Sequence, residues 1–197
     1  MAARRYGGKS GEERDRERRE RLIDAGCVVF GRVGFATATV AHLCREAHVS
    51  LRSYHQVFGV KEEVLSAVVN RCIGDAVRAI RKGLVTGDDV WGLLRGAVAT
   101  YVEYVTSRRA VYRLLYVESC HLANGEPRRD PLAIVLADIL RGQTTLPERS
   151  LRVIVAAVAG MVAALLAQWH GSECVAKEEI IETAMRFCSS ALASGDA

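Results

Sequence analysis

Residues 35–62 constrain this chain more than any other stretch, because they predict two short helices joined by a tight turn, with a third helix opening at Lys61. Thr39 and Ser50 are suited to begin the first two helices, since a hydroxyl can accept hydrogen bonds from the free amides of a first helical turn. The residues after Thr39 fall at helical spacing and give one narrow apolar face: Val40, Leu43, Cys44 and Ala47. The break follows at His48-Val49. This order of capped helix, turn and capped helix predicts a helix-turn-helix.

The second helix of this motif carries polar donors in its first turn. Arg52 offers a guanidinium fork and Ser53 a small hydroxyl, directly after Leu51. A helix N-terminus with such donors, braced by another short helix, suits entry into the major groove of DNA, where Arg binds guanine through O6 and N7. We therefore expect these three residues to read bases and other polar side chains to contact phosphates. The predicted DNA-binding residues are Thr39, Ser50, Leu51, Arg52, Ser53, His55, Gln56 and Lys61.

Residues from about 18 to 65 resemble the DNA-binding domain of the TetR family of bacterial transcription regulators. The matching elements stand in the family's order and spacing: Arg21-Leu22-Ile23-Asp24-Ala25, Val29-Phe30, Gly34-Phe35, Thr39-Val40, Leu43, Glu46-Ala47, Val49-Ser50, Phe58 and Lys61-Glu62. The chain departs from the family at four positions, which are His48, Tyr54, His55 and Val57. His48 stands where the family usually has Gly, and His is among the better non-glycine residues if the turn needs positive φ. Tyr54 falls at a position that is usually buried, so we expect it in the core.

The resemblance implies a ligand-responsive repressor that acts as a homodimer on a palindromic operator of double-stranded DNA. An activator or dual regulator of the same fold, or a helical dimer without a small-molecule effector, is the alternative. A dimer that does not bind DNA at all is a further possibility. In such dimers two recognition helices about 34–36 Å apart occupy successive major grooves.

Composition agrees with an all-α protein. Strand signals are nearly absent, and three prolines interrupt 197 residues. The net charge of +4 lies entirely in residues 1–62, which hold 12 basic and 8 acidic side chains, whereas the remainder is balanced. This location of the surplus positive charge suits a surface that faces phosphates. The six cysteines form no C-x-x-C pair and no signal peptide precedes them, so we expect reduced thiols in a cytoplasmic protein.

The pattern predicts an N-terminal three-helix DNA-binding head and a C-terminal helical bundle, with about nine helices in total. We expect a flexible basic and polar arm over residues 1–17, a helix-turn-helix DNA-binding domain over 18–62, and a ligand-binding and dimerisation domain over 63–197. The predicted helices outside the motif span about 16–31, 61–83, 88–107, 109–122, a short helix from Pro131, 148–170 and 177–193. The apolar stretch 153–167 is shorter than the ~20 residues that span a bilayer, so no membrane is expected.

The last two predicted helices are broadly apolar, and such helices from two subunits can form a four-helix bundle. A helix pair that completes a monomer core is the alternative. The expected dimer interface comprises Val158, Met161, Leu165, Ile181, Ala184, Phe187 and Cys188. The resemblance also implies a ligand pocket between the middle helices, for which the aromatic and weakly polar candidates are Trp91, Tyr101, Tyr104, Tyr112, Tyr116, Cys120, His121 and Trp169. We expect an apolar or aromatic effector.

Catalysis is not expected from this sequence. It contains no nucleophile elbow, no phosphate-binding loop and no spacing of metal ligands. Cys44 and His48 stand four residues apart, but no second pair joins them. We therefore expect no enzyme activity, no cofactor and no metal.

Overall fold

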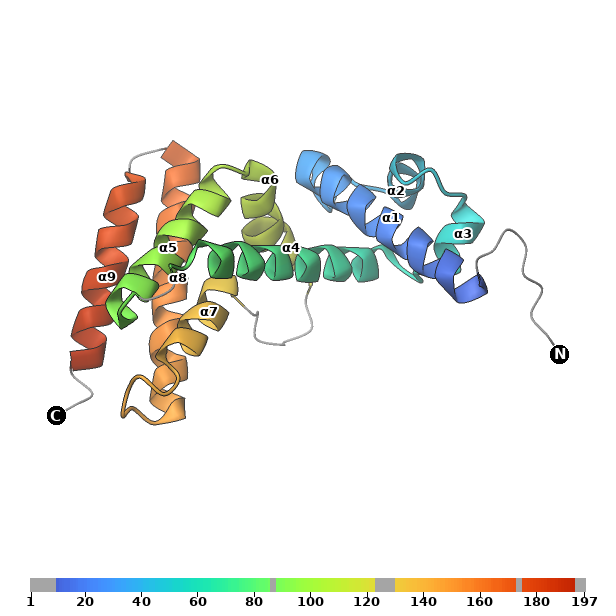
Figure 1. Cartoon of the computed structure of the whole chain (residues 1–197). Helices are drawn as coiled ribbons and strands as arrows, with labels where there is room; N and C mark the ends of the chain where they lie inside the picture. The colour runs from blue at the N-terminus through green and yellow to red at the C-terminus, as the bar shows by residue number, and fades with distance from the viewer. Residues whose placement is uncertain (1–9, 86–87, 123–129, 173–174, 194–197) are drawn as a thin grey trace. The chain divides into compact units, whose positions relative to one another are not determined.

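The computed structural model describes residues 10–85, 88–122, 130–172 and 175–193, and within them it contains helices and connecting turns but no strand (Figure 1). The all-α prediction is confirmed. The elements are α1 (Gly11–Val33), α2 (Val40–Glu46), α3 (Leu51–His55), α4 (Lys61–Gly83), α5 (Val90–Thr106), α6 (Arg109–Tyr112), a π-helical turn η1 (Arg113–Val117), a 3-10 turn η2 (Glu118–His121), α7 (Pro131–Leu140), α8 (Glu148–Ser172) and α9 (Lys177–Ala193).

The first helix begins earlier than the sequence pattern predicted. Ser10 and Glu13 form a capping box, in which the Glu13 amide donates to Ser10 Oγ at 3.1 Å and the Ser10 amide donates to Glu13 Oε2 at 2.6 Å. The predicted start near Arg16 is therefore wrong, and residues 11–17 are helical. The apolar periodicity begins only at Leu22, whereas the polar cap fixes the start of the helix.

The segment predicted as one helix over 109–122 is divided into α6, η1 and η2, so its predicted continuity is wrong. The change of winding places Glu118 and Ser119 in buried positions although both are polar. The Glu118 carboxylate bonds to a part of the chain that is distant in sequence, and no local pattern contains that contact. Tertiary contacts thus override the regular helix here. Isolated π-helical turns are uncommon and frequently occur at functional positions.

Internal contacts divide the chain into two compact units. The first unit, called the head below, comprises Met1–Cys72 and Arg109–Gly125, and the second, called the body, comprises Ile73–Arg108 and Glu126–Ala197. The head therefore includes α6, η1 and η2 as well as the helix-turn-helix, and α4 contributes its first half to the head and its second half to the body. The functional division at residues 17 and 62 stays a prediction.

Within the body, α5, α7, α8 and α9 pack as a helical bundle (Figure 1). Its fully buried side chains are aliphatic apart from Tyr101; the largest are Ile80, Leu94, Tyr101, Leu132, Leu136, Leu166 and Ile180. Ion pairs join helices at its surface, including Lys177 Nζ to Glu103 Oε2 at 2.8 Å. By length and composition alone, the Glu148–Gly171 part of α8 could cross a membrane, and a third of its most apolar window is buried within the chain.

Within the head, α1 lies close against α4 because a glycine removes the side chain at their contact. A Cβ added at Gly26 would lie 2.6 Å from Val68 Cγ2 and 3.2 Å from Val64 Cγ1. Both valines are fully buried, and a β-branched side chain has few alternative rotamers in a helix. Arg71 of α4 also bonds to Glu20 and Asp24 of α1. The position of α1 is therefore fixed by close packing and by ion pairs.

We predict that Gly26→Ala destabilises the protein by about 1 kcal/mol. A helix interior favours Ala over Gly by about 1 kcal/mol, but overpacking a filled core costs ~1–3 kcal/mol. Gly74→Ala is the matched control, because the nearest contact of its added Cβ is Arg78 Nη1 at an ordinary 3.4 Å. Urea unfolding of both variants measures the difference, and equal stabilisation by the two substitutions would contradict the packing argument.

Candidate nucleic-acid interface

The two predicted caps of the helix-turn-helix are confirmed. Thr39 Oγ1 accepts from the His42 amide at 3.2 Å, and His42 Nδ1 accepts from the Thr39 amide at 3.4 Å. Ser50 Oγ accepts from the Ser53 amide at 3.1 Å at the start of α3. Each short helix therefore begins at a fixed residue.

The turn between α2 and α3 contains His48, which stands where the TetR family usually has glycine, and its backbone is left-handed at that residue. His48 has a φ of 53°, and it is the only non-glycine residue with positive φ in the described part of the chain. The Val49 amide donates to the Cys44 carbonyl at 3.0 Å and closes the turn. A left-handed conformation costs a non-glycine residue about 1–2 kcal/mol, and His tolerates it better than most.

The predicted base-reading residues lie on an accessible part of α3. Leu51 is 56% exposed, which leaves a large apolar side chain in solvent at the first position of the helix. Arg52 is exposed, and its side chain forms no hydrogen bond or ion pair with any other described residue. Ser53 is half-buried, and its hydroxyl lies 2.9 Å from that of Ser50. The start of α3 thus presents the guanidinium donors of Arg52 beside the apolar side chain of Leu51.

The predicted phosphate-contacting residues differ in how far the protein itself engages them. Thr39 and His55 are exposed, and the Gln56 Oε1 accepts from Arg18 Nη1 at 3.0 Å. Lys61 is half-buried, and its Nζ donates to the carbonyls of Phe35 and Ala38 at 2.8 Å each. An ammonium has three donors, so Lys61 keeps one for an outside acceptor.

Phe35 lies in the connection between α1 and α2, and its amide, its carbonyl and its ring each contact a charged side chain. Its amide donates to Glu118 Oε2 at 2.8 Å, and its carbonyl accepts from Lys61. The Lys61 Nζ lies 4.1 Å from the centroid of the Phe35 ring. Glu118 Oε1 also accepts from Arg113 Nε at 2.6 Å, and the glutamate side chain is only 4% exposed. This network ties the helix-turn-helix to η1 and η2.

Glu118 is the residue of this network whose place beside the helix-turn-helix the sequence does not indicate. Gly34 gives the physical reason for its position, because a Cβ there would crowd Arg113 Nη2 and lie 3.0 Å from Glu118 Oε1. The φ of 81° favours glycine, and the missing side chain leaves space for the ion pair beside the end of α1. The sequence shows Gly34 as a helix end, but it carries no signal that a carboxylate 84 positions later occupies the freed space.

Tyr54 lies in the head core, as predicted, and its ring is fully buried. Its hydroxyl has no hydrogen-bond partner among the described residues. Burial raises the pKa of Tyr54 to about 12, with smaller contributions from Cys44, Glu63 and Glu62. A buried hydroxyl without a partner is destabilising, because it gives up its bonds to water.

We therefore predict that Tyr54→Phe stabilises the protein by about 1 kcal/mol, since it removes the unpaired hydroxyl and keeps the ring. The neighbouring rings of His55 and Phe58, at centroid distances of 5.1 and 6.2 Å, should keep their contacts. Thermal and urea unfolding would measure the change. A loss of stability would show that the hydroxyl has a partner in solution.

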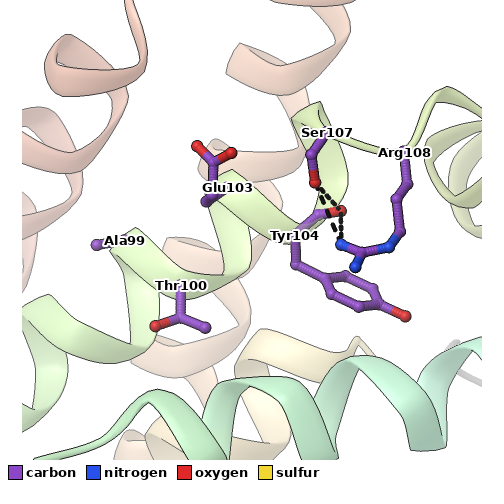
Figure 2. A pocket seen from close by; sticks show the side chains of 6 residues that line it. All are labelled: Ala99, Thr100, Glu103, Tyr104, Ser107 and Arg108. Atoms are coloured by element: carbon purple, nitrogen blue, oxygen red, sulfur yellow. Dashed lines mark hydrogen bonds between the residues drawn. The ribbon is translucent and has the colours of Figure 1, made fainter.

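The body has an open hollow of about 420 Å³ along α5 (Figure 2). It is lined by Ala99, Thr100, Glu103, Tyr104, Ser107 and Arg108. Figure 2 shows the Arg108 guanidinium beside the Tyr104 ring, 4.6 Å from its centroid. Arg108 Nη1 also donates to the Ser107 hydroxyl at 3.2 Å. The hollow therefore offers one aromatic face, one guanidinium and several hydroxyls.

The predicted ligand-pocket residues are divided between the head and the body. Tyr104 lines the α5 hollow, and Tyr101 is completely buried in the body core. The remaining body candidates, Trp91 and Trp169, are exposed and half-buried. The other four belong to the head, where they lie on α6, η1 and η2: Tyr112, Tyr116, Cys120 and His121. His121 packs on the Phe35 ring at a centroid distance of 5.2 Å.

The residues predicted for the dimer interface fall into a buried group and an accessible group. Val158, Ala184 and Cys188 are buried within the single chain, and burial raises the pKa of the Cys188 thiol to about 11. The accessible members are Met161, Leu165, Ile181 and Phe187, of which Phe187 is 47% exposed. Cys44 is buried as well, and burial raises its pKa, so it is a small core residue as predicted.

Known proteins resemble this chain both in sequence and in structure. No family model matches the chain. The HTH-type transcriptional activator FasR of Mycolicibacterium smegmatis is 31% identical over 100 residues, which is 51% of this chain and 46% of that protein. The chain spans less than half the length of the curated relatives it matches.

Two solved structures cover most of the chain. A TetR-family transcriptional regulator from Streptomyces coelicolor has a TM-score of 0.72 at 14% identity, covering 92% of this chain and 84% of that one. The TetR-family repressor FadR of Thermus thermophilus, in complex with lauroyl-CoA, has a TM-score of 0.65 at 22% identity, covering 88% and 94%. The chain therefore has the fold of the TetR-family transcription regulators, and the resemblance seen in residues 18–65 is confirmed.

Proposed function

We propose that this protein is a sequence-specific DNA-binding transcription regulator that acts as a homodimer on a palindromic operator. The observation that carries the proposal is the exposed start of α3, where Leu51 and Arg52 stand free in a doubly capped helix-turn-helix. Arg52 would bind guanine bidentately, and Leu51 would contact a thymine methyl group. Thr39, His55, Gln56 and the remaining Lys61 donor would contact phosphates.

Ligand-responsive repression is the main form of this proposal. FadR is named as a repressor and was solved with lauroyl-CoA, whereas FasR is named as an activator, which supports activation as the alternative. An effector would bind the body of this chain and favour a dimer whose recognition helices have the wrong spacing for DNA. The aromatic face of Tyr104 in the α5 hollow supports an effector with an apolar or aromatic part. We propose a cytoplasmic regulator without enzyme activity.

The dimer interface would form on the accessible face of α8 together with α9. Two thirds of the most apolar window of α8 is accessible in the single chain, and Val153 is 63% exposed. Gly160 and Ala164 lie one turn apart on exposed positions, and a Cβ at Gly160 would meet no described atom within 4 Å. Small side chains let two helices approach closely. A second α8 is a better cover for this face than lipid, because a third of the most apolar window of α8 is already buried against other helices of the chain.

We predict that Arg52→Ala lowers affinity for the preferred operator by ~1–3 kcal/mol and leaves affinity for random duplex DNA nearly unchanged. The reason is that a bidentate base contact is lost, while phosphate contacts remain. The preferred sequence would first be selected from random DNA with the wild-type protein, and both DNAs would then be titrated by fluorescence anisotropy. Equal losses on the two DNAs would exclude Arg52 from base reading.

A second prediction concerns the dimer. Gly160→Leu should weaken dimerisation by roughly tenfold, because the new side chain hinders the approach of a second α8, whereas its Cβ meets no described atom of the chain within 4 Å. The subunit itself should fold as well as the wild type, since Leu is a better helix former. Gly11→Leu is the control, because an added Cβ there also meets open space. Analytical ultracentrifugation measures the dimer constant, and an unchanged constant for Gly160→Leu would place the interface elsewhere.

A further inference from the structure

The head contains a polar hollow that the proposed base-reading surface does not use. It has a volume of about 280 Å³ and is lined by Arg32, His42, Arg45, Glu46 and His48. Arg32 lies in the last turn of α1, and His48 forms the turn that leads into α3. The lining therefore draws on three consecutive parts of the helix-turn-helix fold.

The hydrogen-bonding groups that face this hollow are mostly donors. His42 Nδ1 accepts from the Thr39 amide, so the proton of a neutral imidazole is carried by Nε2. Arg32 Nη2 lies 3.8 Å from Glu46 Oε2, which is a loose contact between exposed side chains. The His48 amide donates to the Arg45 carbonyl at 3.3 Å, but the side chains of Arg45 and His48 form no hydrogen bond or ion pair with any residue in the described part of the chain. Two guanidinium groups and two imidazoles thus outnumber one carboxylate.

His48 supplies an independent reason to expect an outside partner. Its backbone is in the left-handed region, where glycine would be free of strain, yet its exposed side chain has no internal contact that offsets this strain. A side chain kept in such a position without a partner inside the fold points to a ligand that comes from solution. Because His48 and Arg45 line the same hollow, one ligand can contact both.

We propose that this hollow binds a phosphate group. Guanidinium forks match the oxygens of phosphate, and a hollow of this size holds one or a few phosphate units. Two sources have this chemistry, which are the backbone of duplex DNA and a free polyphosphate. The DNA source rests on the proposed function: His48 lies two residues before Ser50, so when α3 enters a major groove the turn lies beside the bordering sugar–phosphate backbone.

The test uses the full chain with Arg45→Ala and His48→Gly, and with Lys82→Ala as a control for the loss of an exposed positive charge outside the head. His48→Gly removes the imidazole and relieves the positive φ, so it should unfold at or above the wild-type temperature. In the DNA arm, random duplex DNA is titrated from about 50 to 200 mM salt. Arg45→Ala should reduce the slope of log K against log salt by about 0.9 and the affinity roughly tenfold, whereas Lys82→Ala should change neither.

In the second arm, tripolyphosphate is titrated into the protein without DNA and followed by amide and imidazole NMR signals. Shifts confined to the lining of the hollow that disappear in Arg45→Ala would support a free polyphosphate, even if the wild-type protein binds no DNA. An effect in the DNA arm alone would support the backbone source. If Arg45→Ala and His48→Gly match the wild type in both arms, the proposal is overturned. A wild-type protein that binds no DNA would instead count against the proposed function, so the two failures are distinguishable.

Discussion

The arrangement of the head depends on how the backbone of Phe35 is held. Its amide donates to the Glu118 carboxylate, and its carbonyl accepts from the Lys61 ammonium, so opposite charges fix the two polar groups of one residue. Phe35 stands between α1 and α2, and its position therefore sets where the first helix of the motif begins. A buried backbone amide without an acceptor would destabilise the fold by about 1–3 kcal/mol. Glu118 therefore stabilises the connection that leads into the helix-turn-helix, although it lies far away in sequence.

The same network explains why the segment after α5 belongs to the head. Arg113 neutralises Glu118 and also donates to the Arg32 carbonyl at 3.2 Å at the end of α1. A buried carboxylate is strongly unfavourable unless it is paired and hydrogen-bonded, and here both conditions are met. The π-helical turn and the following 3-10 turn bring Arg113 and Glu118 onto one side of the segment, five residues apart. A regular helix would separate them around its circumference, so the irregular winding and the ion pair require each other.

Features that depend on neighbouring residues could be predicted from the sequence, and those that depend on distant contacts could not. The caps at Thr39 and Ser50 and the limits of α4 follow from local chemistry, and the structure confirms them. Burial of Tyr54 was expected from the resemblance to the TetR family, in which this position is usually buried, and the structure confirms it. The break in the sixth helix and the role of Glu118 were not, because a glutamate in a helical segment gives no sign that its acceptor oxygens face an amide 83 residues earlier.

Net charge illustrates the same limit in the proposed interface. The sequence places the whole positive surplus in residues 1–62, but the structure shows that several of these cations are already used within the protein. Arg19 lies over the Phe58 ring at 4.3 Å, and Lys61 donates to two carbonyls. Arg45 and Arg52 are instead without partners among the described residues, on the two sides of the α2–α3 turn. A cation that the fold leaves unpaired can offer all its donors to phosphate, so under the proposed function these two arginines would contribute more to binding than the total charge suggests.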